Sequence, residues 1–165
     1  MRTPHADLDT AEAIDTLVRR FYADVAVDDV LGPMFNDVAR VDWSEHIPKL
    51  AAFWRRALLS RPGYEGNPYR VHQLVHAKRP MTPEHFVRWL ELFHDVVDSG
   101  WRGPRAEDAK DLARRVADVH CRQIVGRPVP FSPPPVPGRG DPLDEGGEAA
   151  CWAHLFLVDS EGEPR

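Results

Sequence analysis

The stretch Asp42-Trp-Ser-Glu-His-Ile-Pro-Lys-Leu-Ala-Ala-Phe-Trp54 decides the fold of this chain, because it joins one histidine to an apolar pattern with helical spacing. The pattern runs from i to i+12 and consists of His46, Leu50, Phe53, Trp54 and Leu58. It predicts a helix with one apolar face and an imidazole at the head of that face. Such a helix could roof a pocket, although a single histidine on an apolar face is more often a hydrogen-bonded core residue.

The start of this helix has two interpretations. Asp42 with Glu45 three residues later has the pattern of a capping box, which would place Pro48 inside the helix, where it lacks a donor and clashes with the preceding turn. A start at Ser44 leaves Pro48 near the first turn. We favour the later start, or a bend at Pro48, and the choice decides whether His46 points inward.

Apolar periodicity elsewhere predicts an all-α protein. We expect helices over residues 11 to about 25, 82 to about 98 and 105 or 107 to about 125, and a short helical piece over 69 to about 77. Tyr22 and Trp89 fall on the buried stripes of the first two. Gly32 and Pro33 are expected to break regular structure in an apolar corner at 30–35.

The composition bounds the class of protein. A length of 165 residues fits one domain with a tail, and 42% hydrophobic residues, including five Trp and seven Phe, can fill a core. A net charge of −5 and a pI near 5.9 argue against nucleic acid or an anionic membrane as the partner. With no apolar stretch of membrane-spanning length and no signal-peptide pattern, we expect a soluble, cytoplasmic protein. Cys121 and Cys151 form no disulfide framework.

The composition changes after Gly126. Residues 127–142 are rich in proline and should form an extended, largely disordered linker. The apolar run at 151–158 could dock on the body or on a partner. We therefore divide the chain into a domain over 1–126 and a tail over 127–165.

Two histidines lie one helical turn apart. His72 and His76 would share a helix face and could bind a metal together. The Glu of a zinc-protease helix is absent, since Gln73, Leu74 and Val75 lie between them, and no third ligand is obvious nearby.

Taken together, these segments resemble a truncated haemoglobin, most closely of group III. The resemblance covers roughly residues 10 to 125 and depends on the order and spacing of several short matches. The absence of the paired glycines of the other truncated classes also fits group III. The matches are Phe21-Tyr22, Leu31-Gly-Pro-Met-Phe35, Trp43-Ser-Glu-His46, Phe53-Trp54, Gly66-Asn-Pro68 leading to His72, Phe86, and Trp89-Leu-Glu-Leu-Phe93.

The resemblance implies a two-over-two helical sandwich that holds haem b, with the iron bound by one proximal histidine. Counting forward, the family-like pattern Gly-x-Pro-x-x-x-His fits Gly66, Pro68 and His72 without a gap. His76 is reached only by counting back from Trp89 across a loop of variable length. We prefer His72 as the iron ligand and keep His76 as the alternative.

The resemblance also implies a distal pocket. Tyr22 and Trp89 would donate hydrogen bonds to bound dioxygen, His46 would act as the gate, and Leu50 would lie over the iron. Other expected cofactor contacts are the walls Phe35, Trp54 and Phe86, and the propionate partners Lys78, Arg79 and Lys49, for which a solvated surface role is an equal alternative.

We therefore expect a haem protein that binds dioxygen and reacts with NO, peroxide or similar oxidants, with an external reductase if it turns over. A ligand carrier or sensor is one alternative, in which the tail could signal or dock. A haem-free helical interaction module, in which every histidine is structural, is another.

Overall fold

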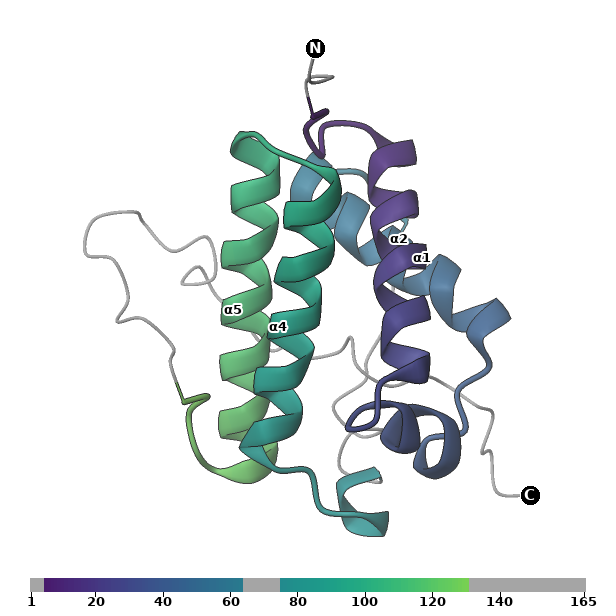
Figure 1. The fold of residues 1–165 in the computed structure, drawn as a ribbon, viewed down its shortest axis with the longest axis vertical. Coiled ribbons are helices and arrows are strands. Elements are labelled where there is room, and N and C mark those ends of the chain that lie inside the picture. Colours follow the sequence, from purple (N-terminus) through teal and green to yellow (C-terminus); the bar gives the residue numbers. More distant parts are fainter. Residues whose placement is uncertain (1–4, 64–74, 131–165) are drawn as a thin grey trace.

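The computed structural model describes residues 5–63 and 75–130, and their regular structure is entirely helical (Figure 1). The all-α prediction is confirmed. The elements are α1 (Ala11–Val27), the π-helix η1 (Pro33–Val38), α2 (Trp43–Leu59), a helical turn at 75–78, α4 (Pro83–Gly100) and α5 (Pro104–Val125). Helix α1 packs against α2 and α4, and α4 lies antiparallel to α5.

Helix α1 begins where its capping residue predicts. The Thr10 hydroxyl accepts the N–H of Ala13, and the apolar stripe that includes Tyr22 is buried. The helix ends at Val27, two residues later than expected, and Asp28 follows as its C-cap. The Asp28 carboxylate accepts the N–H groups of Val30 and Leu31 and, at 2.7 Å, the Nε–H of Arg88 on α4. This carboxylate therefore joins the end of α1 to α4.

The apolar corner is more regular than the sequence predicts. Residues 33–38 form the π-helix η1, so the expectation that Gly32 and Pro33 break regular structure is wrong. Proline suits the first helical position because the N–H it lacks would have no partner there. The wide turn buries Met34 and Phe35 together, and it ends with the Val41 N–H donating to the Phe35 carbonyl at 3.0 Å.

Helix α2 starts at Trp43, with Asp42 as its cap, so the preferred later start at Ser44 is also wrong. The Asp42 carboxylate accepts the N–H of Ser44 at 2.9 Å. Pro48 lies inside the helix, where it leaves the Ser44 carbonyl without its helical donor. Both Ser44 and Pro48 are exposed, so water can bond to that carbonyl. The early start places His46 inward, with 3% of its surface exposed.

The N-terminal segment holds the α4–α5 turn. The Asp7 carboxylate accepts the N–H groups of Arg105 and Ala106 at 3.0 and 2.8 Å, and so caps α5. Gly103, with φ +147°, lies so close that a Cβ there would be 2.5 Å from the Asp7 carboxyl carbon. This cap explains why α5 starts at Pro104, slightly before the predicted position.

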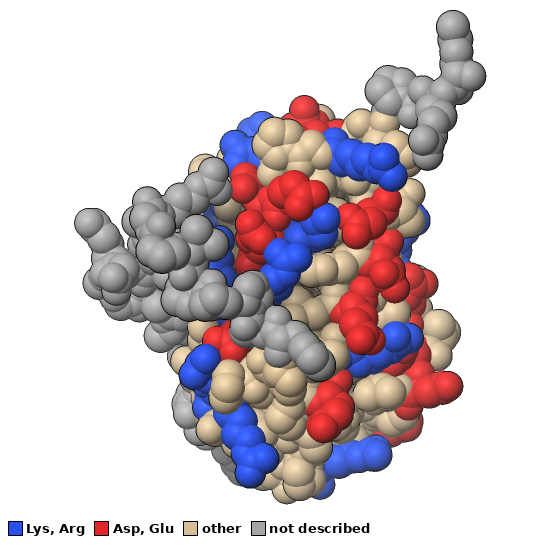
Figure 2. All heavy atoms as spheres, turned by 60° about the vertical axis from the view of Figure 1, so that its left-hand side comes forward, with Lys and Arg blue, Asp and Glu red and all other residues tan. Residues whose placement is uncertain are grey.

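The outer face of α5 is charged, as its sequence predicts. Lys110 pairs with Asp98 at 2.8 Å and with Glu107 at 2.9 Å, and basic and acidic groups alternate over the face shown in Figure 2. Such exposed pairs contribute little stability individually. Among the helices of the described ranges, none is long and apolar enough to cross a membrane.

The start of the predicted tail packs against the helices. Within the described part of 127–165, which is 127–130, Val129 is buried and its N–H donates to Asp118 of α5 at 3.1 Å. Residues 131–165, with Cys151 and the apolar run at 151–158, lie outside the described residues. The division at residue 126 stays a prediction.

Candidate functional site

Tyr22 is the centre of a buried cluster of rings drawn from α1, η1 and α2. Its side chain is 1% exposed, and its ring centroid lies 5.9 Å from that of His46 and 6.2 Å from that of Phe35. Trp43 is 5.9 Å from Tyr22 and stacks on Phe35, with its indole N–H donating to Asn36. The fold thus brings together three residues that the sequence assigned to one pocket: Tyr22, Phe35 and His46.

A second group of rings continues this cluster toward α4. Phe21 contacts Tyr22 at 4.6 Å and Trp89 at 5.3 Å, so Trp89 lies on the same side of α1 as the phenol. Trp54 stacks on Phe93 at 4.8 Å, and Phe93 stacks on Trp89 at 5.5 Å. Trp54 therefore belongs to the same aromatic core but lies further from Tyr22 than Trp89 does in this chain of contacts.

The cluster buries polar atoms, which costs free energy where they lack hydrogen-bond partners. The Tyr22 hydroxyl and the Trp54 indole N–H are fully buried, and neither donates a hydrogen bond to an acceptor in the described ranges. Burial raises the pKa of Tyr22 above its ordinary value, and a hydrogen bond with the Trp89 side chain opposes this rise without reversing it. The phenol therefore stays protonated at physiological pH and keeps its O–H as a donor.

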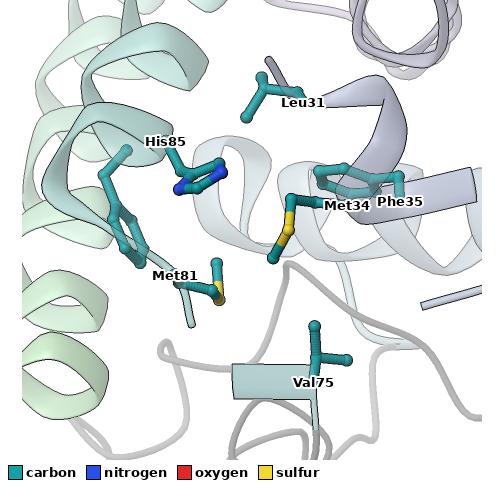
Figure 3. A pocket seen from close by; sticks show the side chains of 7 residues that line it. Leu31, Met34, Phe35, Val75, Met81 and His85 are labelled. Carbon is teal, nitrogen blue, oxygen red and sulfur yellow. The ribbon is translucent and has the colours of Figure 1, made fainter. Parts of the chain in front are cut away.

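An apolar pocket lies where η1, the 75–81 segment and the start of α4 meet (Figure 3). Phe35 lines both this pocket and the Tyr22 cluster, so the two features share a wall. The lining residues are Leu31, Met34, Phe35, Val75, Met81, His85 and Phe86. Two of the expected cofactor contacts, Phe35 and Phe86, are therefore pocket residues.

His85 is the polar side chain of the pocket lining. Its Nδ1 accepts the N–H of Thr82 at 3.0 Å, which completes the cap of α4. Burial lowers the pKa of His85, the contact with Thr82 opposes the shift, and the positive charge of Arg79 adds to it. The ring is therefore neutral at pH 7, with its proton on Nε2.

The two candidate iron ligands differ in what is known of their surroundings. His72 lies outside the described residues. His76 is partly buried, and its Nδ1 accepts the N–H of Met81 at 3.0 Å. A backbone N–H is always a donor, so the proton of a neutral His76 ring is on Nε2. In this tautomer neither ring nitrogen of His76 has a free lone pair for a metal.

The remaining expected site residues separate into buried and exposed ones. Leu50 is buried on the same face of α2 as His46. Lys78 and Arg79 are exposed and line an open hollow together with Asp37, Val38 and Arg40. Lys49 is exposed on α2 and is not part of that lining.

The sequence analysis missed Val75, Met81 and His85 as pocket residues. One signal was available for Met81. It directly precedes the capping residue Thr82, and Phe86 is the fourth residue of the helix, which is the spacing of a hydrophobic staple. The staple predicts that Met81 and Phe86 pack together, which is where the pocket lies. Arg40 was also missed, and no local pattern marks it.

The comparisons with known proteins identify the family of this chain. A family model described as bacterial-like globin matches residues 6–121. The group 3 truncated hemoglobin ctb of Campylobacter jejuni is 36% identical over 90 residues, which are 53% of this chain and 68% of that protein. The crystal structure of group III truncated hemoglobin from Campylobacter jejuni has a TM-score of 0.62 and 29% identity, covering 70% of this chain and 91% of its own.

Both the sequence and the fold therefore lead to one family. The family model spans well over half of the chain, and the structural match confirms the truncated globin sandwich inferred from the helix pattern. The chain belongs to the bacterial-like globins and, within them, to the group III truncated haemoglobins.

Proposed function

We propose that this globin is a cytoplasmic haem b protein that binds dioxygen and reacts with NO, peroxide or a related oxidant. Haem binding as such follows from membership of the globin family. When bound, haem supplies an iron atom with one open coordination position for a small ligand. The identity of that ligand and any turnover are the proposal.

The observation that carries the proposal is the buried hydroxyl of Tyr22, whose O–H has no acceptor among the described residues. A buried phenol without an acceptor among the described residues costs free energy, unless something else accepts its hydrogen bond. A polar diatomic ligand in the pocket would do so. The raised pKa keeps the proton on the oxygen, so Tyr22 acts as a donor and not as a base.

Three other residues complete the proposed distal side. The indole N–H of Trp89 is the second donor, because the Trp89 side chain lies within hydrogen-bond reach of the Tyr22 hydroxyl. His46, buried 5.9 Å from the Tyr22 ring, is the gate, and Leu50 one turn later excludes water. Together they would favour a ligand with partial negative charge and slow its release.

We assign the proximal role to His72. The alternative, His76, already accepts a backbone hydrogen bond at Nδ1, and it would have to give up this bond and move its proton to present Nε2 to iron. That cost favours His72 as the iron ligand. The ungapped spacing from Gly66 and Pro68 to His72 favours the same residue.

The apolar residues fit a flat, hydrophobic cofactor. Phe35 and Phe86 line the apolar pocket, and Trp54 would form a further wall from the aromatic core. Lys78 and Arg79 lie on the 75–81 segment that also supplies Val75 and Met81, so they can reach acidic groups at the pocket edge. We propose no role for Lys49 beyond the surface.

Turnover is tested by NO consumption. We expect the haem-loaded protein, supplied with dioxygen and a reductant, to consume many equivalents of NO, because Tyr22 and Trp89 stabilise the partial negative charge of the ligand. The Tyr22→Phe variant should be slower. Consumption that stops after one equivalent, with reductant still present, would contradict enzyme activity and favour a ligand carrier or sensor.

A further inference from the structure

Three cations gather on one open hollow, which we call the basic hollow. It is lined by Arg40, Lys78 and Arg79, together with Asp37 and Val38. Its formal charge is positive, with three cations against one carboxylate, although the whole chain carries −5. None of the three cations has an ion pair within the described ranges, whereas Arg55, Arg88, Arg105, Lys110, Arg114 and Arg122 all do.

The basic hollow adjoins the apolar pocket, because the same two segments build both. Met34 and Phe35 of η1 line the pocket, and residues 37–40, which continue that segment, line the hollow. The 75–81 segment divides in the same way, with Val75 and Met81 on the pocket and Lys78 and Arg79 on the hollow. A partner seated on the hollow would therefore lie beside the pocket.

Arg40 has a strained backbone conformation at the edge of the basic hollow. Its φ is +51°, in the left-handed region that favours glycine, directly after η1. Its exposed side chain makes no hydrogen bond or ion pair with another described residue. Glycine would adopt this conformation with less strain, and the Arg40 guanidinium does not contribute to the fold through a contact with another described residue.

We propose that the basic hollow is the docking surface for an acidic electron-donor protein, an inference that rests on the haem function proposed above. In the step it would serve, a reduced flavin of the donor would lose one electron, and a bound ferric haem would take up that electron. No atom or proton is exchanged. A positive surface beside the pocket would steer an acidic donor to the side of the molecule on which the proposed cofactor site lies.

Lys78 and Arg79 also have a proposed contact with the cofactor, so the test uses Arg40. The full-length, haem-loaded protein is reduced by photoreduced flavodoxin, an acidic flavoprotein, and the second-order rate constant is followed against salt concentration. Arg40→Glu should lower this rate constant about tenfold at low salt, and Arg40→Gly less, with both differences shrinking at high salt. Arg19→Glu, an exposed charge reversal on α1, is the matched control and should behave as wild type.

Two further readouts separate docking from folding and from cofactor binding. Arg40→Gly should keep or raise the melting temperature, because it removes the strained backbone. Reduction by photoreduced riboflavin, a small donor without a protein surface that could dock on the hollow, should be the same in all variants.

Two results would overturn the proposal. One is an Arg40→Glu rate constant equal to that of Arg19→Glu at every salt concentration. The other is faster loss of haem to apomyoglobin from the Arg40 variants without a selective effect on flavodoxin, which would assign the hollow to the acidic groups of the cofactor. Failure of the haem function itself would be visible separately, as a wild-type protein without a Soret band.

Discussion

Among single residues, Tyr22 matters most for ligand binding, because its hydroxyl can donate a hydrogen bond to a ligand. It is buried, it has no acceptor among the described residues, and its pKa is raised. Each of these properties makes it a donor to a ligand. Neither helix propensity nor apolar periodicity requires a hydroxyl at this position, because a phenylalanine would fill the same space.

We predict that Tyr22→Phe speeds the release of dioxygen about fivefold or more, as expected for the loss of a hydrogen bond of about 1 kcal/mol. Stopped-flow displacement of dioxygen measures this rate. Because the pKa of Tyr22 is raised, its hydroxyl stays protonated between about pH 6 and 9. Titration of Tyr22 should therefore not change the rate of dioxygen release from the wild type in this range. Trp43→Phe, which removes an N–H already bonded to Asn36, is the control. An unchanged release rate in Tyr22→Phe would remove the phenol from the site.

The iron ligand is tested by two glycine substitutions. His72→Gly should abolish the five-coordinate ferrous absorption spectrum and recover it with added imidazole, because the open space accepts a free ligand. His76→Gly should keep that spectrum, since its Nδ1 serves the N–H of Met81. The reverse pattern would assign the iron to His76.

At the scale of elements, Asp28 links the end of α1, the start of the corner and α4. Burial alone would raise the pKa of this carboxyl, but the N–H of Leu31, the Arg88 side chain and the N–H of Val30 lower it below its ordinary value. The unfolded chain therefore takes up the proton first as the pH falls. The stabilisation is complete above the unfolded pKa, near 3.8, and is lost as the pH falls through the lower folded value.

We predict that Asp28→Asn lowers the free energy of unfolding by about 1–2 kcal/mol at pH 7, because a buried carboxylate loses its charge-assisted hydrogen bonds. Urea unfolding measures this change. Asp29→Asn, an exposed neighbour, should change the stability by less than about 0.5 kcal/mol. The difference between the two variants should narrow below the pKa of the unfolded carboxyl. Equal stabilities at pH 7 would show that the Asp28 contacts do not hold the corner.

The elements also show how far the sequence can predict this fold. The starts of α1 and α4 were predicted because caps and apolar stripes are local: Thr10 caps one helix, and Thr82 precedes Pro83 in the other. The start of α2 and the helical form of η1 were not. Pro48 is tolerated because its turn faces water, and η1 closes through wide turns that bury Met34 and Phe35. The start of α2 and the form of η1 both depend on which side of the segment faces the core. Local sequence patterns do not predict this.

One part of the candidate site was predictable from the sequence, and another part was not. The cluster of Tyr22, Phe35 and His46 followed from apolar faces and from the family resemblance. The pocket wall from the 75–81 segment did not, because His85 has the signature of an ordinary capping position. Its exposure to the pocket arises when three segments far apart in the sequence meet.

At the scale of the whole molecule, the proposed cofactor site would lie between a polar wall and an apolar wall. The polar wall comes from α1, α2 and α4, and the apolar wall comes from η1 and the 75–81 segment. A cofactor bound only by this folded arrangement must stabilise it. Haem binding and folding stability are therefore coupled in this protein.

The absorption spectrum of the purified protein during a haem titration tests the central claim most directly. We predict a Soret band that saturates at one haem per chain, shifts on addition of dioxygen to the ferrous protein, and is accompanied by a higher melting temperature. A titration that gives only the spectrum of free haem, with an unchanged melting temperature, would contradict the haem function and favour a helical interaction module.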